Sequence, residues 1–102
     1  MTVYFVINYD VSDAEQYAQY NPGSNHITAT TVANHGGEII VATNDGNNLS
    51  GTVSQMHVII QFPTRSDALA WHDDPEYAAA KSIRLASTTN INAYIVDKLE
   101  MD

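Results

Sequence analysis

The sequence predicts an α+β domain of the ferredoxin-like type, in which a four-stranded antiparallel sheet has its helices on one face. Three observations support this prediction. The segments follow the order β-α-β-β-α-β, which is the split βαβ pattern. A helix-start signal follows the first strand and another follows the third. The length of 102 residues fits one domain, residues 1–102.

The first half of the chain combines strand and helix signals. A stretch of β-branched and aromatic residues favours the first strand. The segment Ser12-Asp13-Ala14-Glu15 has the form of a capping box, which starts a helix through Tyr20. Gly36-Gly37 supplies the C-terminal cap of the next helical segment. The expected strand, two helices and strand lie at residues 2–10, 12–20, 24–34 and 38–43.

The second half of the chain contains similar turn and helix-start signals. A polar segment rich in Asn, Gly and Ser reads as a loop or hairpin connection. Thr64 and Asp67 form a second cap signal. Asp74-Pro75 restarts the helix, because proline fits the first helical position, where an N–H has no partner within the helix. The expected connection, strand, helix, restarted helix and last strand lie at residues 44–52, 55–62, 64–74, 75–87 and 91–99.

Both faces of the expected sheet are apolar. In the strands at residues 2–10 and 55–62, apolar side chains occur at odd and at even positions. The helices cover one face only, and a large apolar face is not stable in water. We therefore expect a homodimer, in which a second copy covers the other face.

Composition narrows the classes of function. The chain has 12 acidic and 4 basic residues and a net charge of −8, which disfavours nucleic-acid and membrane-surface partners. It has no cysteine, and its histidines lack the spacing of a metal site, so neither a metal nor a bound cofactor is expected. No apolar run reaches the roughly 20 residues of a membrane span. The N-terminus does not read as a signal peptide, so we expect a cytoplasmic protein of bacterial type.

The restarted helix carries the first candidate for chemistry. Tyr77, Lys81 and Arg84 lie on one stripe of this helix by their spacing. In a functional role, Arg84 binds a carboxylate or an enolate, with the phenol of Tyr77 close by. The alternative is that Arg84 pairs with one of the 12 acidic residues and orders the helix.

Three further aromatic residues are candidates for the same site. Tyr17 and Tyr20 share a face of the first helix and either line the mouth of a cleft or pack in the core. Trp71 is the only tryptophan, and it either forms a flat wall for a ring-shaped ligand or anchors the helix to the sheet.

One histidine on the third strand is a candidate base. His57 shares a strand face with Ile59 and Gln61, and the expected strand order places Asn8 beside this set. A histidine next to an amide acts as a general base or as a hydrogen-bonding partner of a ligand. It is equally compatible with a satisfied polar core or with an interface.

Nearly the whole chain resembles a known family. The matching segments are residues 10–20, Gly36-Gly37, and Phe62-Pro63-Thr64 through Trp71, Pro75-Glu76-Tyr77 and Arg84. They are similar to the domain of unknown function DUF1330, in the dimeric α/β-barrel superfamily with a ferredoxin-like fold. The resemblance implies a homodimer whose two sheets form a barrel, and a cleft between sheet and helices in each subunit. Proteins of that superfamily include cofactor-free monooxygenases, isomerases, haem enzymes and pure binding modules.

The chain departs from the family pattern in its charges. Basic residues that the family usually shows are replaced by Glu38 and Thr43, and acidic ones by Gln61 and the pair Ser50-Gly51. Lys81 and Arg84 remain as the cations near the expected cleft. A strongly cationic pocket for a multiply charged anion is therefore disfavoured.

Two functions remain open from the sequence. The first is a small-molecule-binding protein that is also a cofactor-free enzyme, of monooxygenase or isomerase type, acting on a small carbonyl or phenolic compound. The second is a ligand-binding or stress-associated dimeric module without turnover. The catalytic candidates are His57, Tyr77 and Arg84. The expected ligand-binding set is Asn8, Tyr17, Tyr20, His57, Trp71, Tyr77 and Arg84.

Overall fold

The computed structural model describes residues 1–20 and 25–100, except for the side chains of residues 19, 20, 25 and 26. Among these residues no helix is long and apolar enough to span a bilayer. The elements in chain order are β1 (Val3–Val11), α1 (Ala14–Tyr20), α2 (Asn25–Asn34), β2 (Glu38–Thr43), β3 (Met56–Phe62), α3 (Arg65–His72), α4 (Pro75–Ser87) and β4 (Thr88–Asp97).

The four strands form one antiparallel sheet in the order β2-β3-β1-β4. The two central strands are thus β1 and β3, with Val3 opposite Phe62 and Tyr9 opposite Met56. The predicted ferredoxin-like fold class is confirmed.

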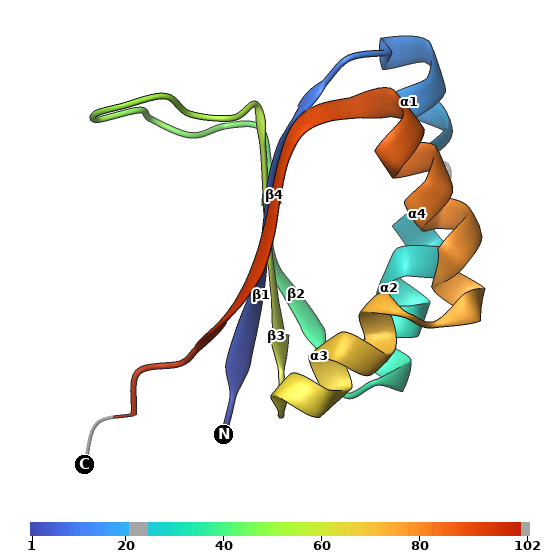
Figure 1. The fold of residues 1–102 in the computed structure, drawn as a ribbon, viewed down its shortest axis with the longest axis vertical. Coiled ribbons are helices and arrows are strands. Elements are labelled where there is room, and N and C mark those ends of the chain that lie inside the picture. The colour runs from blue at the N-terminus through green and yellow to red at the C-terminus, as the bar shows by residue number, and fades with distance from the viewer. Residues whose placement is uncertain (21–24, 101–102) are drawn as a thin grey trace.

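All helices lie on one face of this sheet (Figure 1). We call it the covered face and the opposite one the free face. Alternate residues of β1 are buried against the helices, and the intervening ones are only half-buried. The core of the covered face consists of Val3, Phe5, Ile7, Tyr9, Tyr17, Val32, Ile60, Phe62, Ala68, Trp71, Tyr77 and Ala80.

The helix starts follow the capping signals with one correction. Thr64 accepts a hydrogen bond from the Asp67 amide at 3.1 Å, and Asp74 accepts one from the Glu76 amide at 2.9 Å. The first helix was expected to be capped by Ser12, but the Asp13 carboxylate accepts the bond from the Gln16 amide, at 3.1 Å. Asp13 directly precedes α1 and so holds the N-cap position, which places Ser12 one residue too early to cap this helix.

The last strand begins earlier than predicted. It was expected at residue 91, but β4 starts at Thr88, directly after the final residue of α4. The Thr88 hydroxyl donates to the carbonyl of Arg84 at 2.6 Å, which satisfies a free carbonyl at the helix end without a loop. Because a bulge follows Asn8, β1 can continue its pairing to this early start of β4.

The Gly36-Gly37 turn has two separate causes. Gly36 has a φ of 76°, in the left-handed region, as expected for the C-terminal cap of α2. Gly37 permits a close approach, since a Cβ atom at this position would lie 2.6 Å from the ring of Phe62. The turn thereby fixes α2 against the core of the covered face.

Candidate functional site

A buried arginine stands at the centre of the candidate site. Arg84 lies on the inward stripe of α4 and is only 4% exposed. Its guanidinium carbon lies 5.8 Å from the centre of the Tyr9 ring, which is the geometry of a cation–π contact. Its Nε and Nη1 atoms are buried and have no hydrogen-bond partner among the described residues.

The surroundings of the guanidinium bear on the two roles considered for Arg84. Within the described part of the chain, no carboxylate lies within ion-pair distance of it. The other arginine, Arg65, pairs with Asp97 at 2.9 Å on the surface. Burying a charge without a counter-ion is costly, because the interior does not replace the lost hydration. The arrangement therefore favours an external anion at Arg84 over a structural ion pair.

One phenol ring contacts this cation, and two others lie on the helices that pack beside it. Tyr9 on β1 and Tyr17 on α1 share a hydrogen bond of 2.7 Å between their hydroxyls. Tyr77 lies on the same stripe of α4 as Arg84 and is fully buried. Tyr17, Tyr77 and Arg84, which the sequence proposed as site residues, therefore come from two helices that pack together, α1 and α4. Tyr9 was not proposed, although it has the same parity in β1 as Val3, Phe5 and Ile7 and so lies on the same face.

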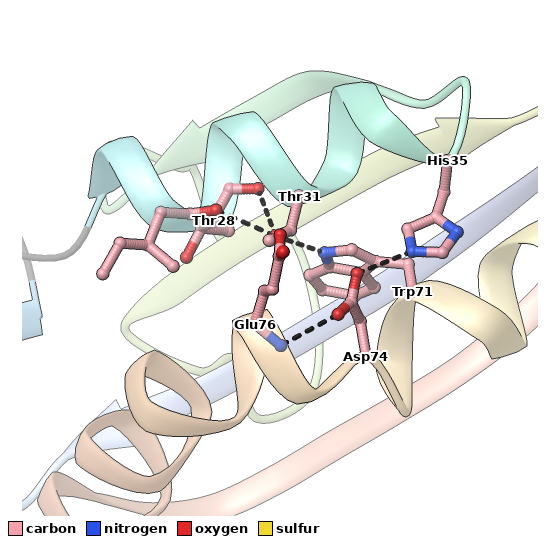
Figure 2. Close-up of polar contacts among 7 residues, drawn as sticks. Thr28, Thr31, His35, Trp71, Asp74 and Glu76 are labelled. Carbon is pink, nitrogen blue, oxygen red and sulfur yellow. Dashed lines mark hydrogen bonds and ion pairs between the residues drawn. The ribbon is translucent and has the colours of Figure 1, made fainter.

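Trp71 is part of the core beneath this site. It has no exposed surface, and its ring stacks on Tyr77 at 4.3 Å and meets Phe5 edge-on at 5.4 Å. Its indole N–H donates to the Thr31 hydroxyl at 3.1 Å (Figure 2). This geometry is that of an anchor between helices and sheet, which was one of its two proposed roles.

His57 and Asn8 do not share a face of the sheet with the other described members of the expected ligand-binding set. The two residues are opposite each other on β3 and β1, as expected. They alternate with Val58 and Ile7, which lie on the covered face, so they belong to the free face. Strand adjacency fixes which residues are neighbours, but not which face they occupy. The interface alternative for His57 is compatible with this position.

Two other candidates have different outcomes. Lys81 lies on the same stripe as Arg84, but its Nζ donates to the carbonyl of His72 at 2.9 Å and so ties α4 to the end of α3. Tyr20 is the last residue of α1, and its side chain lies outside the described residues.

A second polar cluster lies between α2 and the start of α4 (Figure 2). A hollow of about 200 Å³ is lined by Ile27, Thr30, Thr31 and Glu76. Next to it, His35 bonds the Asp74 carboxylate at 2.8 Å. This bond, with a second from the Glu76 amide, holds the pKa of Asp74 below its ordinary value of 3.8. The sequence does not indicate this cluster, because its members are far apart in the chain.

The described residues contain no group of histidine and carboxylate side chains that could bind a metal ion. The groups shown at Arg84 are the guanidinium itself and the Tyr9 ring, whose hydroxyl bonds that of Tyr17, and a guanidinium suits an organic anion.

Comparison with known proteins identifies the family and the fold. A family model described as domain of unknown function (DUF1330) matches residues 2–99. No curated protein matches the chain in sequence.

Solved structures with the same fold come from several bacteria. A protein of unknown function from Rhodopseudomonas palustris has a TM-score of 0.77 at 16% identity, covering 98% of this chain and 84% of that one. A dimeric ferredoxin-like protein of unknown function from Jannaschia sp. CCS1 has a TM-score of 0.74 at 11% identity, covering 96% and 100%. A protein from Nitrosomonas europaea, provisionally named an antibiotic biosynthesis monooxygenase, has a TM-score of 0.69 at 12% identity, covering 95% and 90%.

Proposed function

Since the chain belongs to the family DUF1330, whose description assigns no function, we propose from its geometry that it is a homodimeric protein that binds a small organic acid at Arg84. The observation behind this proposal is the buried guanidinium with two N–H groups that no described residue accepts. A carboxylate or an enolate supplies two oxygens in one plane, which match the fork of N–H donors of an arginine.

The surroundings of Arg84 restrict the class of acid. The Tyr9 ring lies against the guanidinium, so a ligand with a carbonyl or phenolic ring suits this site better than a highly polar one. A single guanidinium balances one negative charge, and the Lys81 ammonium is directed to the His72 carbonyl at the end of α3. We therefore favour a monovalent anion over a phosphate or a dicarboxylate.

The homodimer is supported by the free face of the sheet. Tyr94 and Val96 on β4 are 50% and 41% exposed there, and the helices cover only the opposite face (Figure 1). An apolar sheet face of this kind marks an interaction surface. The protein from Jannaschia sp. CCS1, which shares the fold, is described as dimeric.

A matched pair of arginine variants tests the binding proposal. Benzoate and salicylate serve as probes, and methyl benzoate serves as the uncharged control ligand. We expect both acids to raise the melting temperature of the wild-type protein and of Arg65→Gln, whose arginine lies at the surface. Arg84→Gln should lose this shift, because the amide cannot replace the guanidinium. Circular dichroism and sedimentation verify that each variant is folded and dimeric.

Two results would contradict the proposal. One is an equal ligand-induced shift in Arg84→Gln and in the wild type. The other is a wild-type protein that responds to methyl benzoate as strongly as to benzoate, since the negative charge would then play no part.

A second candidate function is catalysis without a cofactor. Its specific support is the Tyr9–Tyr17 hydroxyl pair, in which Tyr9 also contacts Arg84. A phenol that donates to a carbonyl, next to a cation that stabilises an enolate or phenolate, is suited to proton removal or to oxygenation of such a substrate. The monooxygenase name of the Nitrosomonas europaea protein is consistent with this candidate.

Mass spectrometry separates catalysis from binding alone. Protein incubated with a bound phenolic acid in air either converts it, with matching consumption of dioxygen in the case of oxygenation, or returns it unchanged. Recovery of unchanged ligand from every acid that binds would favour the binding module over the enzyme.

A further inference from the structure

The connection between β2 and β3 extends away from the body of the molecule. This connection, residues 44–55, is here called the arm. It projects from the free face, on the side opposite to the helices (Figure 1). An arm on that side cannot close over the helices of its own chain.

The base of the arm is fixed to the sheet by hydrogen bonds. The amide of Gln55 donates to the Asp10 carboxylate at 2.9 Å, and the Gln55 side chain accepts from the Val11 amide at 2.7 Å. On the other side of the base, the amide of Asp45 donates to the Thr43 hydroxyl at 2.9 Å. These bonds give the arm a defined direction.

The arm carries two apolar residues that are largely exposed. Leu49 is 94% exposed and Val53 is 49% exposed. A leucine on a fixed projection from an apolar face is suited to contact whatever covers that face.

The charge pattern favours a second copy of the chain as the partner that covers the free face. Each chain carries a net charge of −8, so two copies repel each other over most of their surface. The central part of the free face is uncharged and consists of Tyr4, Val6, Asn8, Val41, His57, Ile59, Tyr94 and Val96. Two such faces can meet without placing like charges opposite each other.

The arm extends the surface on the free side beyond the four strands, so it adds contact area to an interface formed there (Figure 1).

We propose that the arm of each copy clasps the other copy, with Leu49 and Val53 buried against it. This inference rests on the proposed homodimer and adds to it a specific contact. Because a twofold interface repeats each contact, one arm variant removes the contact twice.

Sedimentation over a range of protein concentrations tests the arm. The variant is Leu49→Ser with Val53→Ser, and the control is Leu69→Ser, which removes a leucine that is 53% exposed on α3 in the helical layer. We expect the arm variant to raise the dissociation constant of the dimer by at least about tenfold. The control should leave the constant unchanged. If the wild type is dimeric and the arm variant dissociates no more readily, the proposed homodimer is retained but the proposed arm contact is refuted.

A labelling experiment gives an independent readout. The chain has no cysteine, so Leu49→Cys can carry a single polarity-sensitive fluorophore. Its emission should shift to the blue as the protein concentration rises through the dissociation constant, while a label at Leu69→Cys should not respond. A wild-type protein that is monomeric at all concentrations would instead refute the proposed homodimer itself.

Discussion

The two faces of the sheet differ in what their side chains contact. On the covered face, Phe5, Tyr9 and Phe62 pack under the helices and are almost completely buried. On the free face, the neighbouring positions of the same strands carry Tyr4, Val6 and Tyr94, which no helix covers. Both sets are apolar, so hydrophobicity does not distinguish them. The difference is that one face is completed within the chain and the other is not.

The two faces also differ in their charged side chains. The covered face contains a buried cation, Arg84, among rings. The free face has no charged side chain in its central part, although the chain is strongly acidic. The buried cation, for which the described residues supply no counter-ion, is the basis of the proposed ligand site, and the uncharged patch on an acidic surface is the basis of the proposed dimer contact. The two proposals thus concern opposite faces of the sheet.

The largest effect that tests this division is expected from a pair of aromatic truncations. Trp71→Ala, on the covered face, should lower the free energy of unfolding by about 3–5 kcal/mol, because it empties a fully buried site. Tyr94→Ala, on the free face, should weaken association but leave the folding of the monomer nearly unchanged. Urea denaturation at two protein concentrations separates the two quantities. Equal losses of monomer stability in both variants would remove the distinction between the faces.

A smaller effect is expected from two glycine substitutions. Gly37→Ala places a Cβ atom 2.6 Å from the Phe62 ring and 2.9 Å from Val32, and should destabilise the fold by about 1–3 kcal/mol. Gly46→Ala, in the arm, meets the His57 ring at 3.4 Å, an ordinary contact, and should be nearly neutral. Thermal unfolding measured by circular dichroism compares the two. A neutral Gly37→Ala would show that α2 is not held tightly on the covered face.

The smallest effect concerns pH at the helical layer. The bond from His35 lowers the pKa of Asp74 in the folded state below its ordinary value, so the ionised carboxylate contributes stability above about pH 4. That contribution is lost as the pH falls through the folded pKa. Asp74→Asn keeps a capping side chain but removes the charge, so its stability deficit should be present at neutral pH and shrink in acid.

Urea denaturation at several pH values between about 3 and 7 measures this deficit. The control is Asp73→Asn, whose side chain is 80% exposed next to the same helix start. A deficit for Asp74→Asn that does not change with pH would contradict the assigned cause.

The sequence was sufficient for the order of elements and for most of their ends. Asp74-Pro75 starts a helix by local chemistry, and Gly36 ends one in the same way. Local signals were less exact where two neighbouring residues compete. Ser12 and Asp13 both have capping side chains, and α1 begins at Ala14, so Asp13 caps it.

The candidate site was only partly predictable. Arg84, Tyr77 and Tyr17 were found because their spacing places them on inward stripes of helices. Tyr9 was missed, and the position of His57 and Asn8 on the free face was not predicted, because the sequence predicts which strands are neighbours but not which parity faces the helices when both are apolar.

The sequence by itself determined the fold class, most of the helix caps and Arg84 as the candidate cation, because these depend on residue type and on short spacing. Only the tertiary structure decided that Arg84 is buried with no counter-ion among the described residues, that His57 lies on the free face, and that the arm projects away from the helices. These features depend on contacts between segments far apart in the chain, where burial and charge are set by which elements pack together.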